Sequence, residues 1–194
     1  MSSLNPFEPS DLFHSQNINL DPFVENFPTF FYLEYLILNP NYVFKSTETL
    51  TYDKTPKQHI SGYIIGKVEG SQEYHSHISA LAVDNEYRRI KISSNVLLEC
   101  FKNISDYISK VKFIDLFVKC DNKLALNLYE NIGYSIYRRV IGYYDSNNVP
   151  TLKNKNSDTL DAFDMRLCLS RDNLQSMRNG GPNNRCLPSD VVFK

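Results

Sequence analysis

The dominant pattern in the chain is an apolar stretch, a polar and basic turn and a second, periodic apolar stretch over residues 77–108. Residues 77–83 predict a strand, and Asp84 to Arg89 form the turn. In the last stretch apolar side chains recur every four residues, which predicts a helix with a core-facing side: Ile92, Val96, Cys100, Ile104 and Ile108. A strand that runs directly into a helix start collects free backbone N–H groups and two arginines at one point. We therefore expect a site for a phosphate-bearing ligand there.

Upstream of this centre the pattern is less regular. Residues 4–8 predict a short strand, and residues 10–17 predict a helix with Ser10 or Asp11 as its N-cap. The segment from Asn17 to Pro28 is too rich in Asn and Pro to be regular. Two further strands are predicted at residues 42–50 and 59–68, joined by a turn over residues 53–58.

Residues 29–38 predict a helix that is apolar almost all round and that stops at Asn39-Pro40. Such a helix is expected to be buried on every side. Two interpretations stay open. Either the core of the domain covers the whole helix, or the core covers one side and a partner protein covers the other.

Downstream of the centre, strands and helices alternate. Residues 111–120 predict a strand, and Asp121 or Asn122 caps a helix that Gly133 closes. Strands follow at residues 134–144 and 163–169, with a polar loop between them. Strands that are linked by helices around a central strand predict a mixed α/β sheet with parallel pairs near its centre.

Composition limits what such a domain can bind. The chain has 194 residues, a charged fraction of 22% and a net charge of −1, so the molecule as a whole has no electrostatic reason to bind nucleic acid or an anionic membrane. The length fits one domain. Because the regular pattern ends after Arg171, we predict a domain over residues 1–172 and a polar C-terminal tail over residues 173–194 that is flexible or bound to a partner.

The four cysteines, at positions 100, 120, 168 and 186, show neither CxxC nor zinc-site spacing. We therefore expect buried thiols in a reducing compartment, and no metal site. The first residues lack the charged and apolar regions of a secretory signal. The longest apolar run, Phe30 to Leu38, is too short to span a bilayer. These observations predict a cytoplasmic protein.

Two motifs and the order of their neighbours resemble a known family. The motifs are Val83-x-x-x-Tyr87-Arg88-Arg89-x-x-x-Ser93 and Asn122-x-x-Ala125-x-x-x-Tyr129-x-x-x-Gly133-Tyr134. Together they resemble the GNAT acetyltransferase family. Further fragments, in order over residues 11–172, resemble the catalytic subunits of NatB-type protein N-terminal acetyltransferases, among them Asp11-Leu-Phe13, Gly62-Tyr-Ile-x-Gly-Lys67, His75-x-His77, Asp115-Leu-Phe-Val118 and Tyr143-Tyr144.

The resemblance implies a GNAT fold, with a mixed central β-sheet of about seven strands flanked by four helices. It implies an acyltransferase that moves the acetyl group of acetyl-CoA, without a metal, to the N-terminal α-amine of proteins that begin Met-Asp, Met-Glu, Met-Asn or Met-Gln. It also implies a heterodimer with a large helical auxiliary subunit, which we expect at helix 29–38. Nascent protein N-termini are then the substrates, and the ribosome is reached only through the auxiliary subunit, with neither membrane nor nucleic acid as a direct partner.

In this fold the backbone N–H groups of Arg88 to Ser94 and the two arginines would hold the CoA pyrophosphate. The family's loop usually reads Arg/Gln-x-x-Gly-x-Gly/Ala, whereas this chain has Lys91 at the middle glycine. The loop can still bind the pyrophosphate with Lys91 at this position if the Lys91 backbone is helical and its side chain points outward. A bulge at Leu81 to Val83 would turn a backbone N–H toward the thioester carbonyl. The expected acetyl-CoA-binding residues are Leu81, Ala82, Val83, Arg88, Arg89, Ile90, Lys91, Ile92, Ser93, Ser94, Asn122, Asn127 and Tyr129.

Acetyl transfer also needs a base and an acid. A peptide α-amine has a pKa of about 7.7–8.0, so the base removes a modestly held proton. The candidates, acting directly or through water, are His77, Glu25, Tyr143 and Tyr144. His77 has an alternative role, reading an acidic second residue of the substrate through a charge-assisted hydrogen bond. The family implies that Tyr129 protonates the CoA thiolate, and the alternative is that Tyr129 only packs in the core. The expected catalytic residues are Tyr129, His77 and Leu81.

The peptide is expected to bind in a pocket formed by the Asn- and Pro-rich loop and the tandem tyrosines. Its expected contacts are Glu25, Phe27, His77, Ser79, Asn122, Tyr143 and Tyr144. An aromatic pocket suits the methionine side chain of such substrates. Two other functions stay open at this point: a GNAT enzyme that acetylates a small-molecule amine, and a non-catalytic CoA-binding subunit.

Overall fold

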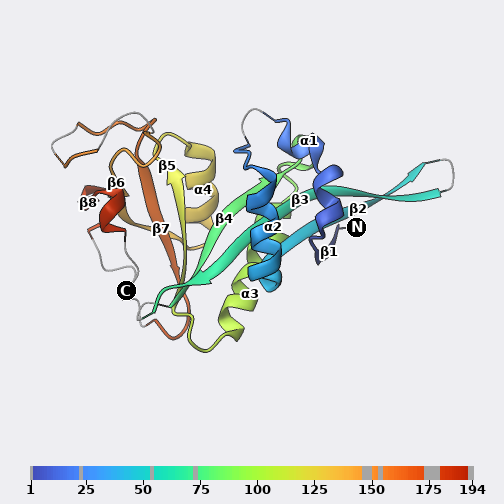
Figure 1. The fold of residues 1–194 in the computed structure, drawn as a ribbon, viewed down its shortest axis with the longest axis horizontal. Helices are drawn as coiled ribbons and strands as arrows, with labels where there is room; N and C mark the ends of the chain where they lie inside the picture. The colour runs from blue at the N-terminus through green and yellow to red at the C-terminus, as the bar shows by residue number, and fades with distance from the viewer. Residues whose placement is uncertain are drawn as a thin grey trace. The chain divides into compact units, whose positions relative to one another are not determined.

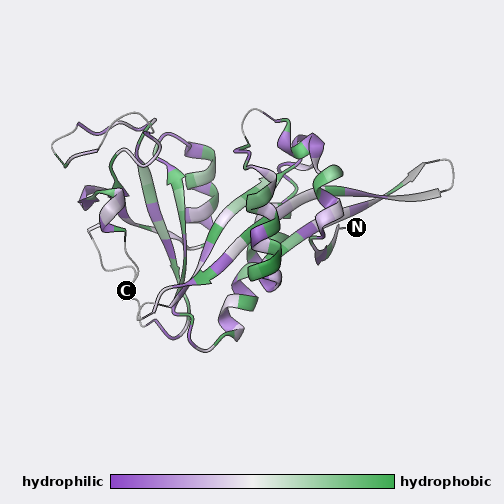
Figure 2. Ribbon diagram, viewed as in Figure 1, coloured by the Kyte–Doolittle hydropathy of each residue, from purple (hydrophilic) through white to green (hydrophobic). Residues whose placement is uncertain are grey.

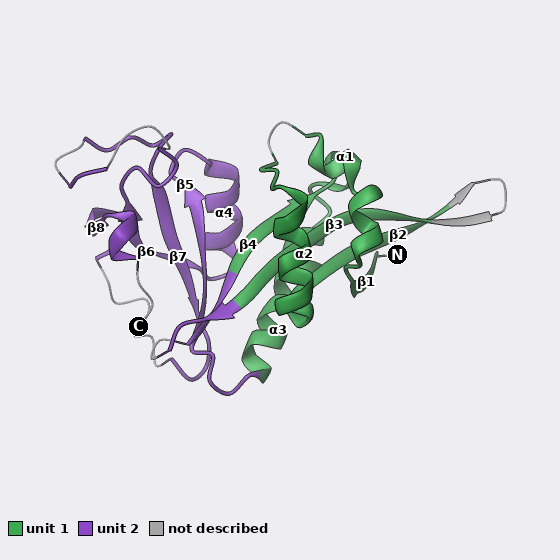
Figure 3. Cartoon of the chain, viewed as in Figure 1, with its two compact units in different colours: residues 1–67, 78–107 green, residues 68–77, 108–194 purple. Residues whose placement is uncertain are grey.

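A computed structural model of the chain describes residues 2–21, 24–52, 55–71, 74–145, 150–152, 155–172 and 180–191. The chain divides into two units, shown in Figure 3. Unit 1 is formed by residues 1–67 and 78–107, and unit 2 by residues 68–77 and 108–194. Strand β4 (His75–Val83) begins in unit 2 and ends in unit 1.

The first strands of unit 1 pair in antiparallel fashion (Figure 1). β1 (Ser2–Pro6) pairs with β2 (Val43–Tyr52), and β2 pairs with β3 (Thr55–Glu69), which lies next to β4. β3 starts earlier than the predicted strand, and the first two residues of the predicted turn, 53 and 54, lie outside the described residues. Gly62 is required in β3, because a Cβ at this position would lie 2.9 Å from the carbonyl oxygen of Ala82 on β4.

Short helices lie between and after these strands. The 3₁₀ helix η1 (Pro9–Phe13), α1 (Gln16–Asn19), α2 (Thr29–Leu38) and the 3₁₀ helix η2 (Pro40–Tyr42) lie between β1 and β2 in the sequence. The 3₁₀ helix η3 (Asn85–Tyr87), the π-helical segment η4 (Ile92–Leu98) and α3 (Glu99–Tyr107) follow β4. The single helix predicted over residues 10–17 is therefore wrong. Its break at Ser15 has a local cause, because the Ser15 hydroxyl donates to the Leu12 carbonyl at 3.4 Å and competes with helical bonding.

Buried apolar side chains from the strands and helices form the core of unit 1: Phe7, Ile18, Tyr32, Val43, Ile60, Tyr63, Ile65 and Ala82. The polar end of Tyr63 is satisfied, since its hydroxyl donates to Asn19 Oδ1 at 2.8 Å. Burial raises the pKa of Tyr63, so the phenol stays protonated and keeps this donor. This bond anchors α1, a helix of only four residues, to β3.

Helix α2 has the predicted boundaries but buries only part of its apolar surface. Tyr32 is buried, and three neighbours pack against the core of unit 1: Phe31, Tyr35 and Leu36. Four large apolar side chains are exposed: Phe30, Leu33, Ile37 and Leu38. Figure 2 shows hydrophobic residues over much of this helix. The expectation that α2 is buried on every side is therefore wrong for the chain alone, because its own core covers only one side of the helix. A partner on the other side stays a prediction.

The strands of unit 2 follow the order β5-β7-β6-β8. β5 (Phe113–Lys119) and β6 (Ser135–Val140) each pair antiparallel with β7 (Ala162–Cys168), and β8 (Arg185–Cys186) pairs in parallel with β6. α4 (Lys123–Asn131) connects β5 to β6. Its predicted ends are confirmed, because the Asn122 side chain accepts the Ala125 N–H at 3.1 Å and Gly133 has a φ of +100°.

Two predictions need adjustment in unit 2. The strand predicted to reach residue 144 ends at Val140, because the chain turns at Gly142, whose φ is +62°. β8 falls within the predicted tail, of which residues 173–179 and 192–194 lie outside the described residues. With eight strands and four α-helices among the described residues, the predicted mixed α/β class is confirmed, with one strand more than expected.

Candidate active site

The loop after β4 has an unusual backbone. Arg89 and Lys91 have φ values of 66° and 67°, a left-handed conformation that costs a non-glycine residue about 1–2 kcal/mol. The ψ of Lys91 is 21°, so its backbone is helical in the left-handed sense, and its side chain is exposed. Glycine adopts this conformation without strain, which gives a physical reason for the glycine expected at this position.

Segment η4 begins directly after Lys91. The Asn95 N–H donates to the Lys91 carbonyl at 2.9 Å, which leaves the N–H groups of the preceding residues 92–94 at the open end of the helix. The exposed Arg89 and Lys91 side chains add positive charge there. Free donors, the helix dipole and two cations suit an anionic group, so the backbone of residues 89–94 fits a pyrophosphate.

The Arg88 side chain is engaged within unit 1. Its Nε donates to the Val83 carbonyl at 3.1 Å, and its two terminal nitrogens donate to Asp21 at 2.6 Å and to Asn85 at 3.5 Å. The guanidinium is therefore directed at protein acceptors. Arg88 was expected to hold pyrophosphate together with Arg89, and in this geometry its side chain has other partners.

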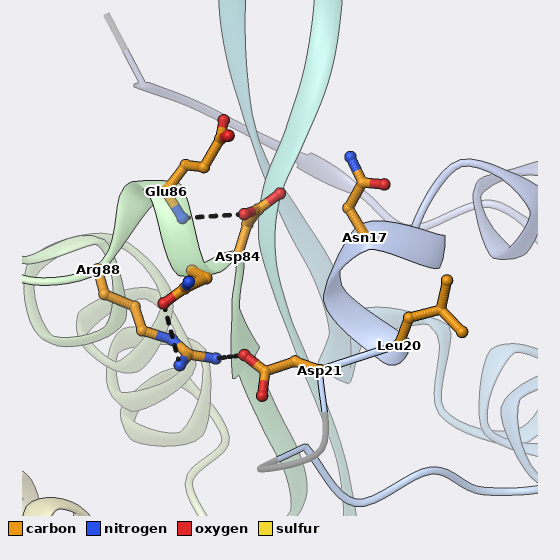
Figure 4. Close-up of a pocket in the computed structure, with 7 residues that line it drawn as sticks. Asn17, Leu20, Asp21, Asp84, Glu86 and Arg88 are labelled. Carbon is orange, nitrogen blue, oxygen red and sulfur yellow. Dashed lines mark hydrogen bonds and ion pairs between the residues drawn. The ribbon is translucent and has the colours of Figure 1, made fainter.

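A pocket of about 530 Å³ lies beside the Arg88–Asp21 pair (Figure 4). It is lined by Asn17, Leu20, Asp21, Asp84, Asn85, Glu86 and Arg88. Asp84 accepts the Glu86 N–H at 3.0 Å and lies 3.0 Å from His59 Nε2. Three carboxylates and one guanidinium line this pocket, so its wall is acidic and does not suit the phosphates of CoA.

The predicted substrate residues of unit 1 are connected through aromatic rings. Phe27 stacks on Phe31 with ring centroids 4.2 Å apart, and Phe31 contacts Tyr35 at 4.5 Å. The Tyr35 hydroxyl and the Ser79 hydroxyl share a hydrogen bond of 2.8 Å. The structure therefore brings Phe27 and Ser79 to one aromatic cluster, while Glu25 is exposed at the start of the same loop. Phe31 and Tyr35 were not predicted as site residues.

In unit 2, His77 is held by a buried carboxylate. Its Nδ1 lies 2.9 Å from Asp115 Oδ1, and the Asp115 side chain is fully buried. Because an ionised carboxylate only accepts, Nδ1 carries the proton in this bond and Nε2 remains available for another partner. His75 lies near the same group, with its Nε2 3.7 Å from Asp115 Oδ1 and 3.5 Å from Glu69.

A row of aromatic rings continues from His77. Phe117 lies 5.6 Å from His77 and stacks on Tyr143 at 4.8 Å, and Tyr143 meets Tyr144 edge to face at 5.0 Å. The structure therefore places three of the expected peptide-contact residues along one row of rings: His77, Tyr143 and Tyr144. Phe117 was missed, although its place two residues after Asp115 puts both side chains on one face of β5.

Tyr129 lies on α4 and is buried, with its ring 5.5 Å from that of Tyr134. Burial raises the pKa of Tyr129, so the phenol remains protonated at neutral pH and is a proton donor. Asn122 and Asn127 are exposed near the start and middle of the same helix. The Asn122 oxygen is used as the helix cap, which leaves its amide nitrogen as the group for a ligand.

Among the residues that the structure describes, no three or more His, Cys, Asp and Glu side chains are grouped so that they could hold a metal ion. None of the helices in the described ranges has the length and apolar character needed to cross a bilayer.

Comparison with known proteins gives consistent matches. A family model described as the acetyltransferase (GNAT) family matches residues 16–134. The N-terminal acetyltransferase B complex catalytic subunit NAT3 of Saccharomyces cerevisiae is 48% identical over 197 residues, which cover 100% of both chains. Two solved structures are also similar. The NatB acetyltransferase complex bound to a bisubstrate inhibitor has a TM-score of 0.83 at 42% identity, covering 98% of this chain and 99% of that one. The NatB complex bound to CoA and MES has a TM-score of 0.66 at 41% identity, covering 86% and 99%.

Proposed function

Because the chain belongs to the GNAT acetyltransferase family, and within it to the catalytic subunits of NatB complexes, we propose that it acetylates the N-terminal α-amine of proteins that begin Met-Asp, Met-Glu, Met-Asn or Met-Gln. The family resemblance inferred from the sequence is confirmed, and so are the enzyme class and the use of acetyl-CoA as co-substrate.

One observation carries the proposed substrate class: His77, fixed by Asp115, begins a row of rings that continues through Phe117 and Tyr143. Aromatic faces suit the flexible, polarisable side chain of a first-position methionine. With Nε2 protonated as well, the His77 imidazolium would donate its Nε2–H to the carboxylate or amide oxygen of an acidic or amide second residue. A small-molecule amine would use neither feature.

For the co-substrate, we place the pyrophosphate of acetyl-CoA on the backbone N–H groups of residues 89–94. Acetyl-CoA supplies an activated thioester. The neutral α-amine attacks the thioester carbon, the C–S bond breaks and the thiolate leaves with a proton. We assign that proton to Tyr129, whose raised pKa keeps the phenol protonated. A backbone N–H of residues 81–83 would stabilise the oxyanion.

The proton on the attacking amine has a separate route. The α-amine has a pKa of about 7.7–8.0, so a substantial share of it is neutral at physiological pH. His77 Nε2, directly or through water, would accept the remaining proton. Alternatively, the same nitrogen donates a hydrogen bond to the second residue of the peptide. The two roles predict different effects of the second residue on the rate when His77 is replaced.

We also propose that the exposed side of α2 binds the auxiliary subunit of the complex, a large helical protein. Phe30, Ile37 and Leu38 are 69%, 76% and 66% exposed, and a group of large exposed apolar side chains on one helix indicates a binding surface. The enzyme would then reach the ribosome through that subunit, in the cytoplasm, and would act on nascent chains.

A turnover assay tests the proposal. The chain is co-purified with the auxiliary subunit of the S. cerevisiae complex and supplied with acetyl-CoA and peptides that begin Met-Asp, Met-Asn or Ser-Asp, or with spermidine. We expect kcat/KM for Met-Asp and Met-Asn to exceed that for Ser-Asp by about 100-fold, with spermidine unreacted. Acetylation of spermidine without turnover of Met-Asp would reject the proposal in favour of a small-amine enzyme.

A further inference from the structure

Arg88 connects three segments of unit 1. Through its three donor groups it holds the Val83 carbonyl at the end of β4, the Asn85 side chain on η3 and the Asp21 carboxylate after α1. Figure 4 shows the guanidinium directed at Asp21 across the edge of the acidic pocket. A planar guanidinium with several donors is well suited to hold such separate acceptors in a fixed relation.

Asp21 stands at the beginning of the predicted peptide-binding loop. Its carbonyl oxygen accepts the Val24 N–H at 3.0 Å, which ties Asp21 to the residue before Glu25. Val24 and Phe27 both pack against the core of unit 1. The Asp21 side chain is 10% exposed and lies 2.6 Å from the Arg88 side chain, which is 36% exposed. The carboxylate is therefore shielded from water, whereas the guanidinium is partly solvated.

From these contacts we propose that Arg88 is a positioning residue for the peptide: through Asp21 it fixes the start of the loop that carries Glu25 and Phe27. The inference rests on the proposed peptide acetyltransferase function. Under it, the guanidinium does not bind the CoA phosphates, which are left to the backbone of residues 89–94. The loop that binds acetyl-CoA and the loop that binds the peptide are then joined by one ion pair.

The competing role of Arg88, a phosphate ligand, predicts the opposite pattern. Removing a guanidinium that binds pyrophosphate would weaken acetyl-CoA binding. Removing Asp21 would then free Arg88 and leave acetyl-CoA binding equal or tighter. Measuring acetyl-CoA dissociation and peptide KM separately therefore distinguishes the two roles.

The test uses the full complex with a Met-Asp peptide, and compares Asp21→Asn, Arg88→Met and the double variant. We expect each single variant to raise the peptide KM about tenfold, because this is the change that the loss of one charge-assisted hydrogen bond produces. The acetyl-CoA Kd by calorimetry should stay within about twofold of wild type. Because the two residues act as one unit, the double variant should be no worse than either single variant.

Arg88→Lys keeps a cation opposite Asp21 and should restore part of the peptide affinity, which a merely structural loss would not show. Asp11→Asn is the matched control, because it removes another charged partner, that of Lys45, in the same unit and leaves the Arg88–Asp21 pair intact. It should leave the peptide KM unchanged.

A tenfold weaker acetyl-CoA Kd in Arg88→Met, with an unchanged peptide KM in Asp21→Asn, would overturn the inference. If Asp21→Asn does not fold, the acetyl-CoA Kd and the peptide KM of Arg88→Met and Arg88→Lys distinguish the two roles of Arg88. Absence of wild-type turnover on Met-Asp peptide would instead refute the proposed function itself.

Discussion

At the scale of single residues, two side chains of unit 2 have the proposed proton-transfer roles. Asp115 lies 2.9 Å from Nδ1 of His77 and orients its ring, and burial keeps the Tyr129 phenol protonated. Acetyl transfer needs such groups at fixed positions, because a misplaced acid or base exchanges no proton with the reacting atoms. Each residue leads to a measurable expectation.

Replacing Tyr129 with Phe removes the proposed acid and keeps the ring that packs on Tyr134. We expect kcat to fall by about 100-fold or more, with the acetyl-CoA Kd within about twofold of wild type. Steady-state kinetics and calorimetry measure the two values. An unchanged kcat would assign Tyr129 to packing alone, and thermal unfolding controls for any loss of folded protein.

His77→Gln separates the two roles of that residue. Glutamine keeps a polar side chain but neither accepts a proton at neutral pH nor carries charge. If His77 reads an acidic second residue, kcat/KM should fall about tenfold more for Met-Asp than for Met-Asn peptides. Equal losses on both peptides would indicate a base, and no loss on either would remove His77 from the site.

These residues could be predicted from the sequence because they belong to the family motifs. Their contacts could not be predicted, because they depend on tertiary structure. The bond between His77 and Asp115 spans 38 positions in the chain, and strand register decides it. Arg88 shows the opposite case. Its position at a helix start suggested phosphate binding, and only the fold shows that Asp21 and the Val83 carbonyl accept its donors.

At the scale of elements, hydrophobic periodicity predicted the order of strands and helices. α2 and the ends of α4 were predicted from Pro40, Asn122 and Gly133, whose local chemistry stops or starts a helix. Errors fell where local bonding overrides periodicity, as at Ser15 within the first predicted helix and at Gly142 beyond β6. The extent of burial of α2 could not be predicted, because periodicity does not show which surfaces face the core.

Lys91→Gly tests the strain in the loop before η4. Glycine takes the left-handed conformation freely, and its own entropy cost offsets part of the gain. We expect the free energy of unfolding to rise by about 0.5–1 kcal/mol, measured by urea denaturation. Ser93→Gly is the matched control, since it places glycine inside the helical segment and should lower stability by about 0.5 kcal/mol. Destabilisation by Lys91→Gly would show that the lysine side chain contributes more than its backbone strain costs.

Ile37→Asp tests the exposed side of α2. The residue is 76% exposed, so the chain alone should keep its thermal midpoint. At a buried interface the new carboxylate would be desolvated, and we expect the affinity for the auxiliary subunit to fall at least tenfold. Glu34→Gln, on the same helix, serves as a change in charge outside the apolar group. Unchanged association in pull-down and calorimetry would place the interface elsewhere.

At the scale of the whole molecule, the proposed functions divide between two units. Unit 1 carries the two loops proposed to bind acetyl-CoA and the peptide, and unit 2 carries His77, Tyr129 and the tandem tyrosines. β4 belongs to both units. This division was not predictable from the sequence, because a strand shared by two units has the same periodicity as any other strand.

The most direct measurement of the central claim is made in S. cerevisiae. The chain replaces the resident NatB catalytic subunit, and mass spectrometry quantifies acetylation of cellular protein N-termini. The account predicts that acetylation returns on proteins beginning Met-Asp, Met-Glu, Met-Asn and Met-Gln, and that Tyr129→Phe at equal abundance restores little of it. Acetylation that stays absent from these proteins, with the chain expressed and bound to the auxiliary subunit, would contradict the account.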